Sequence, residues 1–189
     1  MRKATSTEVK RCFVTANFAR PPRQRRRYVG GLPKEEFTER VVLARKRAAA
    51  LSPRQLDNII AKEYKRRLRA YDNSDWVLRT VRLNEVGVWR KAGELPHAWT
   101  TGSAVDTARH VRSHQPPDSA LRQFAKIAAW TQREKLYPIV FQHNTGTTGR
   151  RSLSRKLLGH LDDGCMRSIA LALSGRKTVT VYFGTPKKK

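Results

Sequence analysis

The sequence predicts an α+β fold: one compact domain of several helices with a small sheet, a basic N-terminal arm and a short basic C-terminal tail. Apolar residues recur at helical spacing along residues 34–51, 53–71 and 119–136. Shorter runs at 137–142 and 178–183 are rich in β-branched and aromatic residues, which favour strands. A length of 189 residues, 39% of them hydrophobic, suits one core with tails.

An extended basic arm is predicted for residues 1–31. Its second half contains PPRQRRRYVGG at 21–31, whose guanidinium groups cannot be buried without partners. Its first half, residues 1–20, has five basic side chains against one acid. If helical, it would place Val9, Phe13 and Ala16 on one face with Cys12, a pattern typical of an organellar targeting segment. A basic arm and a targeting segment are the alternatives for residues 1–20.

Two helices are predicted at the start of the body, which spans residues 32–184. Pro33 suits the first position of a helix over 34–51. Ser52 and Gln55 then form a capping box for a second helix over 53–71. The second helix carries an apolar stripe of Leu56, Ile59, Ile60, Tyr64, Leu68 and Tyr71.

The rest of the body is predicted to alternate short strands and helices. The expected order is a hairpin within 76–90, a loop at 91–102, a short helix capped by Ser103 and Asp106, a helix over 119–136, a strand at 137–142, helical structure from Leu153 to Leu173 interrupted at 162–164, and a strand at 178–183. Helices are predicted between the strands at 137–142 and 178–183, so the connection can cross over and leave these two strands parallel. Residues 185–189 form the basic tail.

The net charge predicts a polyanionic partner. Forty Lys and Arg residues against fifteen Asp and Glu give +25 and a pI near 11.3, so the free chain repels itself. A solvated surface would mix both signs more evenly. Arginine outnumbers lysine 26 to 14, and its planar fork matches phosphate oxygens and base edges. The sequence contains no run of about 18 apolar residues that could span a bilayer, so nucleic acid is favoured over a membrane.

The residues expected to contact nucleic acid lie in the arm, on the second helix, in a loop before residue 156 and in the tail. Tyr28 follows three arginines in the arm and is expected to stack on a base or pack on a partner. The full set is Arg20, Arg23, Arg25, Arg26, Arg27, Tyr28, Lys62, Lys65, Arg66, Arg69, Arg150, Arg151, Arg155, Lys187, Lys188 and Lys189.

The loop at 143–152 resembles a phosphate cradle only in part. It follows a predicted strand and precedes a predicted helix, but the nucleotide-binding pattern GxxxxGK[ST] has Asn144 in place of its first glycine and Arg150 in place of its lysine. We therefore expect no nucleotide hydrolysis here. Its glycines and arginines could hold a phosphate of a nucleic-acid backbone, or the segment could be an ordinary surface loop.

The sequence predicts no catalytic residue, metal ligand or cofactor. Cys12 and Cys165 lie in no metal-binding pattern, and the five histidines are scattered. Asp162 and Asp163 could hold magnesium for phosphodiester cleavage, but adjacent acids on a helix point in different directions. We therefore expect a protein that is not an enzyme.

In composition the chain resembles ribosomal proteins as a class, which combine a compact body with arginine-rich segments that thread and neutralise rRNA. The resemblance implies a structural RNA-binding role in a large ribonucleoprotein, with structured rRNA and neighbouring proteins as partners, in mitochondrial or cytoplasmic ribosomes. Two alternatives remain: a viral coat or nucleic-acid packaging protein, and an RNA-acting nuclease or duplex-RNA-binding regulator.

Overall fold

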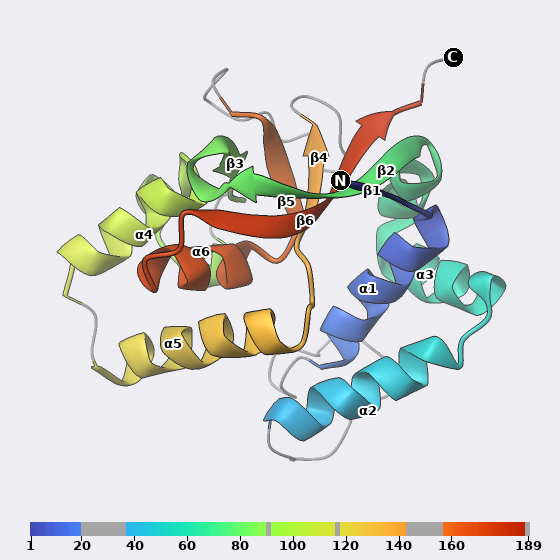
Figure 1. The fold of residues 1–189 in the computed structure, drawn as a ribbon, viewed down its shortest axis with the longest axis horizontal. Coiled ribbons are helices and arrows are strands. Elements are labelled where there is room, and N and C mark those ends of the chain that lie inside the picture. Colours follow the sequence, from blue (N-terminus) through green and yellow to red (C-terminus); the bar gives the residue numbers. More distant parts are fainter. Residues whose placement is uncertain (20–36, 90–91, 116–117, 143–156, 188–189) are drawn as a thin grey trace.

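The computed structural model describes residues 1–19, 37–89, 92–115, 118–142 and 157–187. It contains a six-stranded mixed sheet with the strand order β1-β2-β6-β4-β5-β3 (Figure 1). The strands are β1 (Arg2–Ala4), β2 (Ser74–Arg82), β3 (Val86–Gly87), β4 (Ile139–Gln142), β5 (Gly159–Asp163) and β6 (Thr178–Pro186). The predicted compact α+β fold is confirmed.

The pairing of the strands brings distant parts of the chain together. β2 pairs antiparallel with both β1 and β6, and β4 pairs antiparallel with β5. β6 runs parallel to β4, and β3 runs parallel to β5. The parallel arrangement of β4 and β6 is the one expected for a crossover connection.

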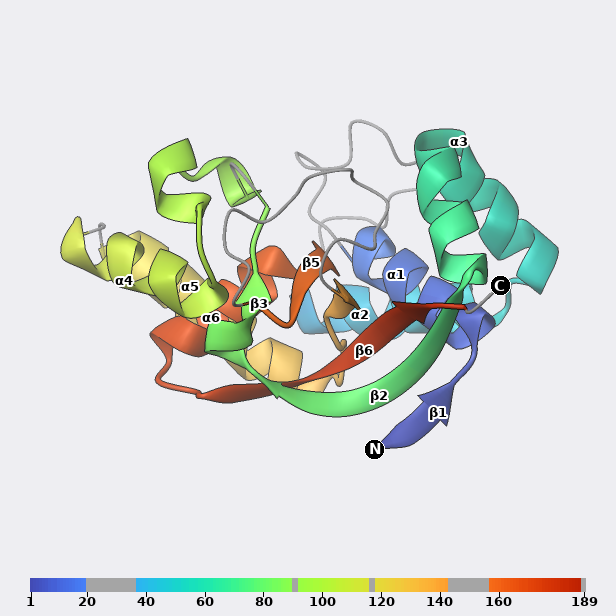
Figure 2. The same ribbon diagram turned by 90° about the horizontal axis from the view of Figure 1, so that it is seen from above.

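Helices cover both faces of the sheet. They are α1 (Ser6–Phe18), α2 (Phe37–Ala49), α3 (Pro53–Asp72), α4 (Ala104–Ser113), α5 (Asp118–Arg133) and α6 (Cys165–Leu173). On β4, Ile139 and Phe141 join the core of α1, α2 and α3, whereas Val140 between them joins the core of α4, α5 and α6. Since successive strand residues point to opposite faces, the two cores lie on opposite sides of the sheet. Figures 1 and 2 show the two helical groups separated by the central strands.

The helix starts follow the predicted capping residues. The Ser52 hydroxyl accepts from the Gln55 amide at 3.3 Å, and the Gln55 side chain accepts from the Ser52 amide at 2.8 Å. Ser103 and Asp106 make the same reciprocal box at α4. Each box satisfies two backbone donors that the first turn leaves free.

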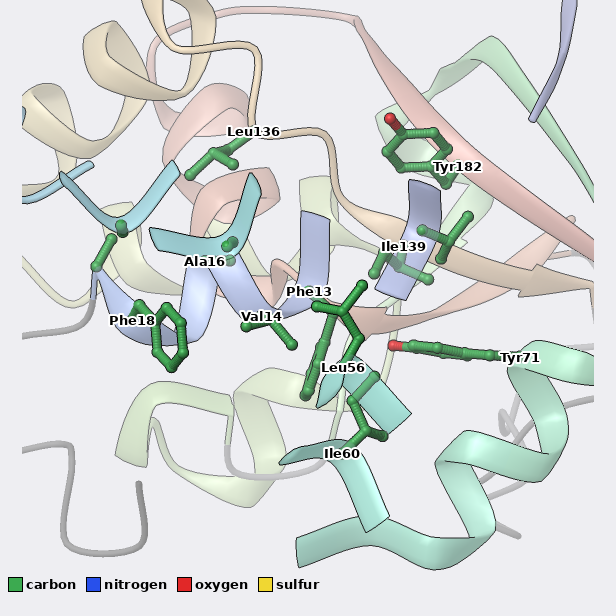
Figure 3. Close-up of a cluster of buried hydrophobic side chains, with 14 of the residues drawn as sticks. Phe13, Val14, Ala16, Phe18, Leu56, Ile60, Tyr71, Leu136, Ile139 and Tyr182 are labelled. Carbon is green, nitrogen blue, oxygen red and sulfur yellow. The ribbon is translucent and has the colours of Figure 1, made fainter. Parts of the chain in front are cut away.

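The N-terminal segment differs from the expectation of an extended arm. Residues 2–4 form β1, which pairs Arg2 with Leu78 of β2, and residues 6–18 form α1. Val9 is fully buried on the inner face of α1. Phe13 and Val14 are buried in the same core (Figure 3). Residues 2–18 therefore belong to the folded body, because burying these side chains outweighs the basic composition of the segment.

Two predicted elements are wrong. Residues 76–90 do not form a hairpin: β2 pairs with β6, whereas β3 pairs with β5 after a short 3-10 turn, η2 (Leu83–Glu85). The helix expected to run through 157–161 is also wrong, because β5 occupies 159–163. An apolar run of this length fits a buried strand as well as a helix turn, and pairing with β4 decides between them.

Smaller differences concern the segments around the strands. The predicted loop at 91–102 contains two short 3-10 helices, η3 (Ala92–Glu94) and η4 (His97–Thr100). The predicted strand at 178–183 continues to Pro186, so the first residues of the predicted tail pair with β2.

Candidate nucleic-acid interface

One side of α3 carries a row of exposed cations, which we call the cationic face of α3. With about 100° of rotation per residue, its members fall within an arc of about 120°. They are Arg54, Lys62, Lys65, Arg66 and Arg69, all exposed. Four of the five were predicted to contact nucleic acid; Arg54 was not among the predicted residues, although it shares their helical spacing.

The opposite side of α3 fixes the helix on the body. Leu56, Ile60 and Tyr71 are buried and face Phe13 of α1 (Figure 3). The rings of Phe13 and Tyr71 meet edge to face, with centroids 6.0 Å apart. The apolar stripe thus anchors α3 along its length and leaves the cationic face toward solvent.

Two acids of α3 bond to side chains of the body itself. The buried amine of Lys10 lies 2.7 Å from Asp57 Oδ1 and 2.6 Å from Asp72 Oδ1. Ser6 also donates to the Asp72 carboxylate, at 2.9 Å. Both acids therefore bond to α1, where the single positive charge of Lys10 balances one of the two carboxylates.

The C-terminal segment meets the end of α3. Lys187 Nζ donates to the Asp72 carbonyl at 2.6 Å, and the Lys187 amide donates to the Asn73 carbonyl at 3.0 Å. A lysine at a helix C-terminus also interacts favourably with the helix dipole. The structure thus brings one predicted tail residue next to the predicted helix residues.

The other predicted contact residues lie outside the described part of the chain. They are Arg20, Arg23, Arg25, Arg26, Arg27, Tyr28, Arg150, Arg151, Arg155, Lys188 and Lys189. The predicted phosphate-cradle loop, 143–152, is outside it as well. The described chain resumes at Leu157 and enters β5, so the helix expected after this loop is replaced by a strand over 159–163.

A buried ionic cluster lies beneath the cationic face. Arg67 Nε is 2.8 Å from Asp162 Oδ2 on β5, and the Tyr71 hydroxyl donates to the same oxygen at 2.7 Å. The Arg67 guanidinium lies over the ring of Phe13, 4.6 Å from its centroid. The cluster ties α3 to the sheet through Arg67, which was not among the predicted functional residues. The signal available in the sequence is its helical spacing between Ile60 and Tyr71, which places it on the apolar stripe.

The environment of this cluster shifts two pKa values in the same direction. Burial raises the pKa of Tyr71 well above its ordinary value, and the nearby Asp162 raises it further. Burial alone would lower the pKa of Arg67, but the attraction of Asp162 leaves it raised. At neutral pH the cluster therefore holds a charged arginine and a protonated tyrosine.

The acid pair considered for magnesium is held by arginines. Asp162 bonds to Arg67 and Tyr71, and Asp163 is paired with Arg167 of α6. All these side chains are buried. Within the described ranges, no group of three or more His, Cys, Asp or Glu residues is placed to hold a metal ion.

The two cysteines are free thiols in separate places. Burial raises the pKa of both Cys12 and Cys165 to about 12. Cys12 Sγ donates to the Tyr137 carbonyl at 3.5 Å. Both are therefore protonated, weakly reactive side chains at neutral pH.

Comparisons with known proteins gave no significant match to a family model, a curated protein or a solved structure. Of the helices in the described residues, none combines the length and the apolarity needed to cross a membrane.

Proposed function

We propose that the protein is a structural RNA-binding component of a large ribonucleoprotein, and specifically a ribosomal protein that neutralises rRNA in a mitochondrial or cytoplasmic ribosome. The net charge of +25 requires a polyanion, and the cationic face of α3 offers one a defined contact surface. A role in binding rather than catalysis accounts for Asp162 and Asp163, whose carboxylates hold the fold together.

One observation carries the proposal: cations cluster on one exposed helix face, while Asp57 and Asp72 of the same helix are bonded to the body. Side chains three and four residues apart on a helix lie about 5–6 Å apart, so the face presents closely spaced donors. Phosphate oxygens accept charge-assisted hydrogen bonds from both lysine and arginine. This surface therefore suits the backbone of a nucleic acid.

The surface suits RNA better than a lipid headgroup layer. A helix that lies in a membrane interface inserts large apolar side chains beside its cations. The exposed large hydrophobic side chains of the described residues are Met1, Val42, Leu43 and Leu121, and none of them lies on α3.

The test is a titration of ribosomal RNA across salt with matched charge variants. In the first variant Lys62, Lys65, Arg66 and Arg69 are changed to glutamine. In the control, four exposed cations of α2, α5 and the segment before β6 are changed to glutamine: Lys46, Arg122, Lys126 and Lys177. Both variants lose four positive charges. A difference between their RNA affinities therefore depends on where the charges lie and not on the net charge.

We expect the α3 variant to reduce the slope of log K against log salt by about 4, because each cation that pairs with a phosphate contributes about one to this slope. The control should change the slope by less than half of that. Equal effects of the two variants, or no binding of RNA by the unaltered protein, would contradict the proposal. Co-sedimentation with ribosomal subunits that is abolished in the α3 variant would support the ribosomal assignment.

A further inference from the structure

We propose that the cationic face of α3 binds duplex RNA through its phosphate backbones, in preference to single-stranded RNA. This inference rests on the proposed function and names the form of RNA that the cationic face of α3 binds. Three features support it: the rigidity of the helix, the length of the cation row, and the kind of side chains exposed on the described surface.

The helix that carries the cations is fixed at both ends and in the middle. The capping box of Ser52 and Gln55 fixes its start, and Lys187 bonds to its end. In between, Arg67 is paired with Asp162 of the sheet. The Tyr71 carbonyl accepts from Trp76 Nε1 at 2.9 Å, which ties the last turn to β2. The cations therefore extend from a backbone whose position is set before any ligand arrives.

The row matches a long stretch of regular polyanion. Arg54 and Arg69 are fifteen residues apart, which corresponds to about 22 Å along the helix axis. Double-stranded DNA carries about one charge per 1.7 Å of its axis with both strands counted, so a duplex of similar charge density contains roughly 13 phosphates in this length, and the helix faces those on one side. A rigid row of donors and a rigid row of acceptors pair with little loss of conformational freedom.

A single strand would lose more freedom on the same surface. Its backbone must be ordered on binding, and proteins that bind single strands offset this cost by stacking bases on exposed aromatic rings, at about 1–3 kcal/mol per base. The large exposed hydrophobic side chains of the described surface, Met1, Val42, Leu43 and Leu121, are not aromatic. Core rings such as Trp76 and Phe141 pack edge to face against each other, with centroids 5.1 Å apart.

The expected binding depends on shape rather than on sequence. Contacts to phosphates position a protein without reading bases, and duplex RNA is recognised mainly through its backbone and its shallow groove. The surface should therefore accept duplexes of different sequence with similar affinity.

The experiment compares two probes on the full chain. One is oligouridine, which does not fold on itself, and the other is the same oligouridine paired with oligoadenosine. Affinities are measured by fluorescence anisotropy at about 150 mM salt for the unaltered protein, the α3 variant and the control variant. A duplex of mixed sequence serves as a third probe.

We expect the unaltered protein and the control variant to prefer both duplexes over the single strand by at least about tenfold, which is about 1.4 kcal/mol. The α3 variant should lose most of this preference. A smaller preference in the unaltered protein, or one that the α3 variant retains, overturns the inference.

The outcomes separate this inference from the proposed function. If the α3 variant weakens binding of both probes equally, the inference fails and the RNA-binding role of α3 stands. If neither probe binds, or if the control variant weakens binding as much as the α3 variant, the proposed function fails as well.

Discussion

Arg67 and Asp162 form an ion pair that is almost fully enclosed, with side-chain exposures of 6% and 2%. Removing one member leaves a buried charge without its partner, which costs about 3–5 kcal/mol, whereas replacing both by apolar groups is often nearly neutral. We therefore predict that Asp162→Leu lowers the free energy of unfolding by about 3–5 kcal/mol. The double variant R67M/D162L should recover only part of that loss, because the buried Tyr71 hydroxyl still lacks its acceptor, which costs about 1–3 kcal/mol.

Urea unfolding of Asp162→Leu, Arg67→Met and the double variant gives the coupling energy of the pair. A loss below about 1 kcal/mol for Asp162→Leu would show that the pair contributes little to holding α3 on the sheet. Because Arg67 faces the core and not the cationic face, the double variant should keep the salt dependence of RNA binding.

The residues whose roles could be predicted from the sequence are those whose partners are close to them in the chain. Ser52 and Gln55 are three positions apart, so their capping box could be predicted from spacing alone. Arg67 finds Asp162 across 95 positions of the chain, and no local pattern contains that contact. The arginine was therefore grouped with neither the core nor the interface.

At the scale of elements, α1 is the helix whose role the sequence concealed. Its apolar face was interpreted as part of a basic arm or a targeting segment, yet Val9, Phe13 and Val14 are almost fully buried. Lys10, which reads as part of a basic arm, is buried and bonds to two acids of α3. A charged side chain of this kind is predicted as exposed unless its partners are known.

We predict that Phe13→Ala destabilises the protein by about 3–5 kcal/mol, as expected for a buried aromatic side chain. A chain without residues 1–19 should lose cooperative unfolding, because the faces of α2 and α3 that pack on α1 would be exposed. Thermal unfolding followed by circular dichroism measures both.

The matched control is Val42→Ala on the outer side of α2, where 54% of the residue is exposed and a small effect is expected. If the shortened chain unfolded as cooperatively as the full chain, residues 1–19 would be dispensable to the fold, as a removable targeting segment requires.

Some strands could be predicted from their local composition and others could not. β4 and β6 were predicted from their composition, and both are central strands. A second strand was predicted within 76–90, but its partner was wrong, because β3 pairs parallel with β5 and not antiparallel with β2. β5 could not be placed, because it is short and is defined by its antiparallel pairing with β4. Pairing of this kind depends on the fold of the whole chain and not on a window of residues.

At the scale of the whole molecule, the surplus of positive charge opposes the folded state. The Debye length falls from about 30 Å at 0.01 M salt to about 8 Å at 0.15 M, so added salt screens the repulsion between distant cations. We predict that the unfolding temperature rises over this range.

The two glutamine variants provide the control for this prediction, since each removes four positive charges from an exposed place. Both should show a smaller rise than the unaltered protein, and the two should be alike. An unfolding temperature that is independent of salt would indicate that self-repulsion is unimportant in the isolated protein.

The position of β6 has a consequence for how the protein is made. This strand lies between β2 and β4, so the centre of the sheet stays open until residues 178–186 have been synthesised. During translation, β2 and β4 each lack a neighbour while many of the arginines have already emerged from the ribosome. The sheet is therefore completed only after α1 to α6 have been synthesised, and a chaperone that shields exposed strand edges would act in that interval.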